Sequence, residues 1–393
     1  MDKKNNVPWL DNAVFYEIYP QSFRDTNADG IGDFNGIIEK LDYIKELGCN
    51  AIWLNPCFLS PFGDAGYDVQ DYCTAAPRYG TNEDLIRVFG EVHKRGMHII
   101  LDLVPGHTSS KHEWFVESSK PERNEYSDRY IWSDSIWEDT GSLPCLRGMS
   151  QRDGSAALNF FSMQPALNYG YYKGNAAEFI AKYKENYEKT DGRGLICIPS
   201  GNHDMDRLAR HLDTDEIKTA FTFLLTMPGA PFIYYGDELG MKYVEGLTSV
   251  EGGYGRTGSR SPMQWSGGLN AGFSSARADK LYIPIHEEYK TINAQTEMAD
   301  ENSVYSEVKR LIAVRQANPA LQSRGSITWL SDGYPMSYIR EGEGQRVMVV
   351  INPSAQSEFV ECDAKKVLYT VGDVDVNGGT AVMGGCSALI AEI

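Results

Sequence analysis

The sequence predicts an α/β protein built on parallel strands and followed by a small antiparallel β-domain. Short apolar, strand-like runs alternate with one-faced helical patterns over residues 14–104. Further strand and helix signals lie within residues 175–317, and beyond Ser323 the chain changes to short alternating runs. Because strand, helix, strand order implies parallel pairing with right-handed crossovers, the chain opens either a doubly wound sheet or a TIM barrel.

The parallel part contains runs rich in apolar and β-branched residues, several of them stopped by a proline. Five strands are therefore expected, at residues 14–19, 51–55, 98–104, 195–198 and 231–235. Helices are expected at residues 36–47, 175–188, 215–226 and 302–317, and one more between Thr81 and Gly96. The first helix has the clearest pattern, since Ile37, Leu41 and Ile44 share one face and Gly48 ends it.

Two other stretches, residues 106–172 and 323–393, lack this alternation of strand and helix patterns. Residues 106–172 are irregular and rich in Ser, Asp, Trp and Tyr, which indicates a small excursion domain over the strand ends. Residues 323–393 are expected to form an antiparallel domain of sandwich type, with turn residues between the strands. Its strands are expected at residues 326–330, 335–340, 346–351, 358–361, 366–370 and 387–392.

The composition limits the classes of partner. A formal charge of −17 argues against nucleic acid or an anionic membrane as partner. The N-terminal residues lack the apolar core of a signal peptide, and no stretch approaches the length of a transmembrane helix. The seven cysteines are scattered without metal-type spacing and favour reduced thiols. The sequence thus predicts a soluble, cytoplasmic protein.

A calcium site is expected directly after the first strand. Oxygen-bearing side chains alternate along the loop from Asp25 to Asp33, and Gly30 stands where a calcium loop turns sharply. Ile31 would add its backbone carbonyl. The ligands expected are Asp25, Asn27, Asp29, Ile31 and Asp33. The alternative is a polar turn in which Asp33 only caps the next helix.

Polar clusters follow several of the expected strands. In parallel sheets, catalytic and binding residues usually lie at the carboxyl ends of the strands. His203 and Asp204 stand directly after the 195–198 strand, and Asp102 and His107 follow the 98–104 strand. A simpler interpretation makes Asp204 or Asp206 the N-cap of a helix that starts at Arg207. Taken alone, the two interpretations are about equal, but the clusters at successive strand ends favour a common pocket.

Several motifs in order resemble those of glycoside hydrolase family 13, the α-amylase superfamily, over nearly the whole chain. They are Tyr67-Asp-Val-Gln-Asp-Tyr72, Asp102-Leu-Val-Pro-Gly-His107, Gln164-Pro-Ala-Leu-Asn168 and Asn202-His-Asp204. Gly236-Asp-Glu-Leu-Gly-Met241 and Arg260-Ser-Pro-Met-Gln-Trp265 resemble the branch of α-glucosidases, oligo-1,6-glucosidases and trehalose synthase. Gly106 and Ala166 depart from residues that many members have.

The resemblance implies both a fold and a set of site residues. Residues 1–105 and 173–322 would form the first and last parts of a TIM (β/α)8-type barrel. Asp204 would be the carboxylate that stabilises the transition state, and His107 and His203 would bond the −1 sugar. Tyr67 would stack beneath that sugar, while Asp68 and Arg260 would pair to close its pocket. The loop of Asp25, Asn27, Asp29, Ile31 and Asp33 matches the calcium loop of the branch.

One large departure concerns the catalytic pair. Retaining glycosidases need a nucleophile and an acid/base carboxylate on either side of the scissile bond. The family carries them after the fourth and fifth strands, yet here one helix and a turn separate Asn168 from Gly192. At roughly 30 residues per βα unit, about three units, strands four to six, are missing from the barrel. Glu238 and Glu178 are poor substitutes, because both carboxylates must sit about 5 Å apart across the sugar.

The parent protein is therefore expected to hydrolyse or transfer α-linked glucosyl units of small oligosaccharides by a retaining mechanism. This chain is expected to be inactive, as an internally deleted version of such an enzyme. Its partners would be α-glucan or α-glucoside oligosaccharides. The alternative is a non-catalytic carbohydrate-binding or regulatory homologue that kept the pocket rim and lost the carboxylates.

Overall fold

The computed structural model describes residues 7–130, 132, 176–190, 192 and 194–393. The Gln164–Asn168 motif and most of the expected excursion domain lie outside the described residues. Within the described ranges, no helix is both long enough and apolar enough to cross a membrane. Cys49, Cys57, Cys73, Cys362 and Cys386, all in this part of the chain, form no disulfide bond.

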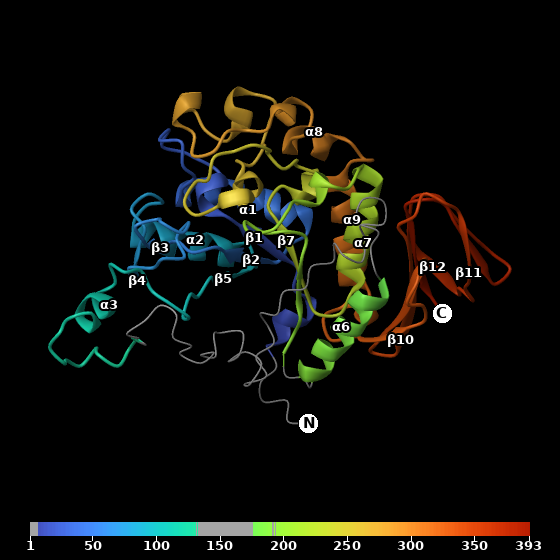
Figure 1. Cartoon of the computed structure of the whole chain (residues 1–393). Coiled ribbons are helices and arrows are strands. Elements are labelled where there is room, and N and C mark those ends of the chain that lie inside the picture. The colour runs from blue at the N-terminus through green and yellow to red at the C-terminus, as the bar shows by residue number, and fades with distance from the viewer. Residues whose placement is uncertain (1–6, 131, 133–175, 191, 193) are drawn as a thin grey trace.

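The five expected parallel strands form one sheet at the centre of the molecule (Figure 1). They are β1 (Phe15–Ile18), β2 (Ala51–Leu54), β5 (His98–Leu101), β6 (Cys197–Pro199) and β7 (Ala230–Tyr234). All neighbouring pairs are parallel, and the order across the sheet is β5-β2-β1-β7-β6. Each strand lies within a few residues of its predicted position.

This order separates a barrel from a doubly wound sheet. In the doubly wound order the fourth strand of the chain would lie beside the first. Here the last strand, β7, pairs with β1, with Phe15 opposite Phe232, and β6 lies outside it. A cyclic order of this kind belongs to a barrel, in which the last strand returns to the first.

The two faces of the sheet are covered differently, which also indicates a barrel. Alternate residues such as Tyr16, Ile52 and Ile233 share a core with the large helices. The residues between them, including Phe15, Trp53 and Phe232, form a separate cluster that contains no residue of those helices. Helices on one face and a separate apolar layer on the other are the arrangement of a barrel wall.

The helices begin where their capping residues predict. They are α1 (Phe34–Leu47), α2 (Asn82–Lys94), α3 (Glu113–Ser118), α6 (Ala176–Thr190), α7 (Thr214–Thr226), α8 (Ala294–Ala299) and α9 (Val304–Ala317). Thr81 and Asp84 form a capping box at the start of α2, and Asp213 and Glu216 form another at α7. Short 3-10 helices, including Tyr254–Arg260, lie in the connections.

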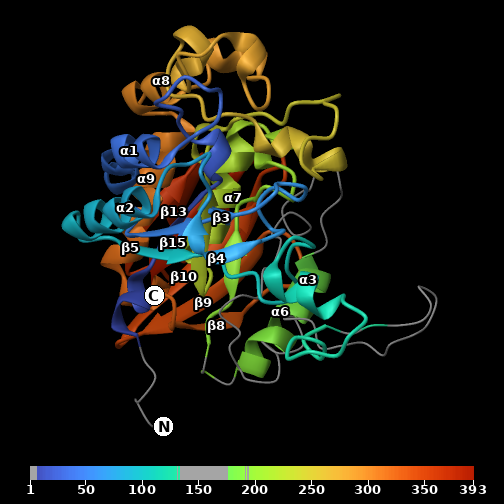
Figure 2. The ribbon, with the colours of Figure 1, turned by 90° about the vertical axis from the view of Figure 1, so that its left-hand side faces the viewer.

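The C-terminal region forms two antiparallel sheets, which lie beside α7 and α9 (Figure 1 and Figure 2). The larger contains β8 (Ser326–Trp329), β9 (Met336–Gly342), β10 (Gln345–Asn352), β12 (Lys366–Val371) and β15 (Ser387–Glu392). The smaller contains β11 (Glu358–Glu361), β13 (Val374–Asn377) and β14 (Thr380–Met383). Met348, Leu389 and Met383 share an apolar cluster that spans both sheets. The sequence analysis did not predict β13 and β14, which pair as a short hairpin that turns at Gly378-Gly379.

Candidate active site

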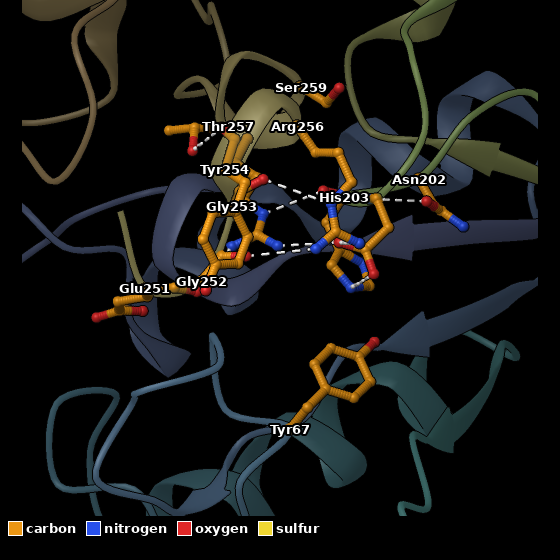
Figure 3. Close-up of polar contacts among 12 residues, drawn as sticks. Tyr67, Asn202, His203, Glu251, Gly252, Gly253, Tyr254, Arg256, Thr257 and Ser259 are labelled. Carbon is orange, nitrogen blue, oxygen red and sulfur yellow. Dashed lines mark hydrogen bonds and ion pairs between the residues drawn. The ribbon is translucent and has the colours of Figure 1, made fainter. Parts of the chain in front are cut away.

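Two of the predicted site residues, Tyr67 and His203, lie close together beyond the carboxyl ends of the parallel strands (Figure 3). Tyr67 is in the loop between the short strands β3 (Phe58–Leu59) and β4 (Asp71–Ala75), which follow β2. His203 and Asp204 follow β6, and Arg260 ends the 3-10 helix Tyr254–Arg260. Segments from three different connections therefore meet at one edge of the sheet.

His203 is buried between two aromatic rings. Its imidazole stacks on Tyr67 with ring centroids 4.9 Å apart and on Tyr19 at 5.6 Å. Both stacks are nearly parallel, which fixes the plane of the imidazole. Burial lowers the pKa of His203 to about 4, so the ring is neutral at pH 7.

Asp204 is held by two arginines. Its Oδ1 accepts from Arg260 Nη2 at 2.9 Å and lies 3.1 Å from Arg256 Nη1. Its Oδ2 lies 3.6 Å from Nε2 of His203. The side chain is 41% exposed, so a molecule in solvent can reach the carboxylate.

The N-cap interpretation does not describe this segment. The next helix is a short 3-10 turn, Leu208–Arg210, and no side chain caps it. Asp206 accepts a hydrogen bond from Arg210 at 2.6 Å and lies 3.1 Å from His211 Nε2. Asp204 therefore bonds to the side chains of the strand-end cluster and does not cap a helix.

Arg260 joins the segment after β6 to the segment after β7. Its guanidinium donates from Nε to the carbonyl of His203 at 3.0 Å and from Nη1 to the carbonyl of Glu251 at 3.3 Å. Ser22 donates to the carbonyl of Arg260 at 2.6 Å and fixes its backbone. These bonds hold the guanidinium of Arg260 rigidly and leave its Nη2 to bond Asp204.

Tyr67 connects the cluster to the end of β5. Its hydroxyl donates to Asp102 Oδ2 at 2.8 Å, and His107 Nε2 lies 3.1 Å from the carbonyl oxygen of Tyr67. Burial raises the pKa of Asp102 to about 6, against the hydrogen bonds from its neighbours. His107 is exposed. Tyr67, His107, His203, Asp204 and Arg260 thus form one continuous set of contacts.

Asp68 is the exception among the predicted residues. It was expected to pair with Arg260, but its carboxylate accepts from Ser60 Oγ at 2.7 Å and from the backbone amide of Gly63 at 2.9 Å. Arg260 instead bonds to Asp204. The expected pair is absent because backbone donors of its own loop satisfy Asp68, and Asp204 lies within reach of Arg260.

Other carboxyls near the strand ends are enclosed. Glu238, considered above as a substitute catalyst, is fully buried and accepts hydrogen bonds from Tyr16 at 2.7 Å and Tyr43 at 2.6 Å. Burial raises its pKa to about 7. Asp237 is buried in an ion pair with Arg207 at 3.1 Å. Glu178 lies exposed in the first turn of α6.

The loop expected to bind calcium is folded back on itself. Asp25 is buried and its carboxylate accepts backbone N–H groups of Asn27, Ala28 and Gly30 at 2.8–2.9 Å. Asp33 caps α1 through the amide of Gly36. Asn27 and Asp29 are exposed. Among the described residues, no group of three or more His, Cys, Asp or Glu side chains is placed to hold a metal ion.

Sequence reasoning missed four residues that build the site. Tyr19 stacks on His203, Arg256 pairs with Asp204, and Glu17 and Asn55 lie beneath the cluster. Only Glu17 gave a signal, as a charged residue inside an apolar strand.

Comparison with known proteins places this geometry in a family. The model of the alpha-amylase family, catalytic domain, matches the chain in two parts, residues 17–169 and 149–324. Oligo-1,6-glucosidase of Bacillus sp. (strain F5) is 27% identical over 511 aligned residues, which cover 87% of this chain and 99% of that protein. Trehalose synthase/amylase TreS of Mycobacterium tuberculosis (strain CDC 1551 / Oshkosh) is 27% identical, with 91% and 84% covered. A crystal structure of a MutB mutant in complex with glucose has a TM-score of 0.82 at 25% identity, covering 98% of this chain and 100% of that one.

Proposed function

Because the chain belongs to the α-amylase family, in the branch of oligo-1,6-glucosidases and trehalose synthases, we propose that its strand-end cluster binds an α-linked glucosyl unit without hydrolysing it. The observation that carries this proposal is the state of the carboxyls in the described part of the site. Asp204 is open to solvent but bound to two arginines, whereas Glu17, Asp237 and Glu238 are fully enclosed.

A retaining glycosidase needs two carboxyls about 5 Å apart on opposite sides of the glycosidic bond. Asp204 matches the family residue that stabilises the transition state, which is neither of the two. Glu238 points its bonded oxygen at Tyr16 and Tyr43, on the side of the sheet that the helices cover. The described residues therefore offer the rim of a sugar site without its nucleophile and acid.

The missing carboxyls are best explained by the internal loss of about three βα units, strands four to six. The alignment with the Bacillus relative extends over 511 positions, more than the 393 residues of this chain. The family model matches in two parts that meet at residues 149–169. The five described strands correspond to strands one, two, three, seven and eight of a barrel, which supports a gap between β5 and β6.

In this proposal the sugar lies against Tyr67, and His107 and His203 bond its hydroxyls. Asp204 would accept from its 2- and 3-hydroxyls, and the Arg260–Asp204 contact would open to admit them. The ligand class follows the family: α-glucoside oligosaccharides, with the linkage unspecified. The MutB mutant structure named above contains glucose, the sugar unit from which such oligosaccharides are built.

The test combines turnover with binding. Purified protein is incubated with an aryl α-glucoside and with isomaltose, beside Asp204→Asn. We expect no turnover above that variant, and activity in a version with the missing units restored. Glucose binding, followed by NMR, should weaken in Asp204→Asn and Tyr67→Ala but not in Asp206→Asn, which changes a neighbouring carboxylate of the same loop. Turnover above Asp204→Asn, or binding unaffected by all three changes, would contradict the proposal.

The rival proposal is a dedicated non-catalytic sugar-binding or regulatory protein. The observation in its favour is that Arg256 and Arg260 together compensate the charge of Asp204 without help from missing units. The gene sequence across codons 168–192 separates the two. An interrupted or misassembled reading frame indicates accidental loss, and a clean frame in independent isolates indicates a stable protein.

We also propose that the loop Asp25–Asp33 binds Ca²⁺. Its residue types suit a hard cation, since Asn27 and the carbonyl of Ile31 would supplement three aspartates. Asp25 and Asp33 would have to exchange hydrogen bonds within the loop for the ion. Gly30 has φ of +93°, and a Cβ there would collide with the carbonyl of Lys280. Ser274 donates to Asp25 at 2.5 Å, so a bound ion would tie this loop to residues 270–282. Calcium titration by calorimetry should give one site that Asp29→Asn weakens and Asp279→Asn does not; absence of binding heat would refute it.

A further inference from the structure

Three neighbouring side chains beneath the site each have a buried polar atom with no hydrogen-bond partner among the described residues. These atoms are Oε2 of Glu17, Oδ1 of Asn55 and Nδ1 of His203. Glu17 and Asn55 are fully buried, and His203 is 4% exposed. Asn55 Nδ2 donates to Glu17 Oε1 at 3.2 Å, and His203 Nδ1 lies 3.8 Å from the same oxygen. Unpaired buried polar atoms cost about 1–3 kcal/mol each, so such a group needs an explanation.

The other side of the imidazole decides where its proton lies. Nε2 of His203 faces Oδ2 of Asp204 at 3.6 Å, and Asp204 is an ionised partner of Arg256 and Arg260. The separation is longer than a hydrogen bond, but a carboxylate only accepts hydrogen bonds, so its position beside Nε2 favours the tautomer with the hydrogen on Nε2. A neutral imidazole has one N–H, and Nδ1 is then an acceptor.

The buried cluster consequently lacks a donor. With Nδ1 as an acceptor, an ionised Glu17 would leave Oε2, Asn55 Oδ1 and Nδ1 as three buried acceptors on neighbouring side chains, none of which receives a hydrogen from a described residue. A protonated Glu17 supplies the missing hydrogen. The distance of 3.8 Å between Nδ1 of His203 and Oε1 of Glu17 is longer than a hydrogen bond. It is too short for a water molecule to fit between the two atoms. A side-chain movement of about 1 Å would bring them within hydrogen-bond distance.

We infer that Glu17 keeps its carboxyl proton at neutral pH and uses it to donate a hydrogen bond to Nδ1 of His203, and is thus a positioning residue that fixes His203 as the Nε2–H tautomer. The Nε2–H bond is then presented at Asp204, where the proposed function places the sugar. Only this role in sugar binding rests on the proposed function. The position of the proton does not.

The charged groups around the pair agree with this assignment. Burial is the main cause of the raised pKa of Glu17, and Asp102, Asp237 and Asp204 raise it further. Burial also lowers the pKa of His203, and Arg260 and Arg256 oppose its protonation while Asp204 favours it. Tyr19 and Tyr67 cover the two faces of the imidazole and bring no formal charge.

The tautomer can be read directly from ¹⁵N-histidine NMR of the full chain, with His203 assigned by the signals lost in His203→Gln. At pH 7 we expect Nδ1 to be of the unprotonated type and Nε2 of the protonated type. Glu17→Gln, whose amide N–H can also donate, should keep this pattern. Glu17→Met has no donor, and both nitrogen signals of His203 should shift.

Glu238→Gln is the matched control, since Glu238 is also a fully buried glutamate with an unpartnered Oε2, and it should leave the His203 signals unchanged. A proton on Nδ1 in the unmodified protein overturns the inference, as does an unchanged His203 spectrum in folded Glu17→Met. If Glu17→Met does not fold, the unmodified protein and Glu17→Gln decide alone. Added glucose should shift Nε2; failure of that shift alone counts against the proposed function and not against the proton position.

Discussion

The two edges of the parallel sheet are covered very differently. At one edge, every residue of β6 is buried, and Arg207 in the segment after it forms a buried ion pair with Asp237, which follows β7. At the other edge, all four residues of β5 are only half-buried. Leu103, just beyond β5, is 69% exposed, and Ile86 on α2 is 65% exposed. The greater exposure of β5 shows that this edge of the sheet is less covered by other residues than the β6 edge. That exposure agrees with the proposed loss of the βα unit that would follow β5.

The largest effect should come from the well-covered side. Asp237→Ala leaves the guanidinium of Arg207 buried without its anion and should cost about 3–5 kcal/mol of unfolding free energy. Burial raises the pKa of Asp237 to about 6, against the pull of Arg207, so the pair is charged at pH 7. Urea unfolding measures the loss. Asp42→Ala removes an exposed partner of Arg95 and should cause no measurable loss; equal effects would contradict the comparison.

A second prediction compares two residues that face each other in the sheet. Ile52 on β2 pairs with Ile99 on β5, but Ile52 is fully buried and Ile99 is only half-buried. Ile52→Ala should cost about 2–5 kcal/mol, because it opens a cavity in a packed core. Ile99→Ala should cost clearly less in the same urea experiment. Equal losses would mean that β5 is as well packed as the centre of the sheet.

A third prediction concerns pH on the covered side. Burial raises the pKa of Glu238 to about 7 from an ordinary 4.5, so the folded state holds a proton that the unfolded state releases. Stability from this group is complete below pH 4.5 and falls as the pH rises towards 7. Glu238→Gln should remove that slope and gain up to about 3 kcal/mol at pH 8 relative to the unmodified protein. Urea unfolding at pH 4.5, 6 and 8 tests this, and an unchanged slope would refute it.

The smallest effect is expected at the open edge. Leu103→Gln should change the unfolding free energy by no more than about 0.5 kcal/mol, because the side chain already meets solvent. It should also lower self-association at high protein concentration, measured by light scattering, if exposed apolar groups beside β5 drive it. A loss of several kcal/mol would show that Leu103 is covered in solution.

The sequence located the parallel strands and the long helices, because hydrophobic period and capping residues are local signals. It could not order the sheet without the family resemblance, since the β1–β7 pairing joins distant segments. The hairpin of β3 and β4 was also missed, because it is short and lies inside a connection.

The site was predictable only where a motif marks it. Tyr67, His107, His203, Asp204 and Arg260 belong to motifs and do meet in the structure. Asp68 belongs to a motif too, yet its partners are local backbone groups that no motif specifies. Tyr19, Asn55 and Glu17 act through burial and ring stacking across the fold, which sequence spacing does not encode.

The pairing of β1 with β7 has a consequence for synthesis on the ribosome. Phe15 stacks on Phe232, with ring centroids 4.3 Å apart, yet Phe232 is translated on the order of 200 residues later. At about 5–20 residues per second, the nascent β1 waits roughly 10–40 seconds with one edge unpaired. During that interval its aromatic face is a target for chaperones and for neighbouring nascent chains.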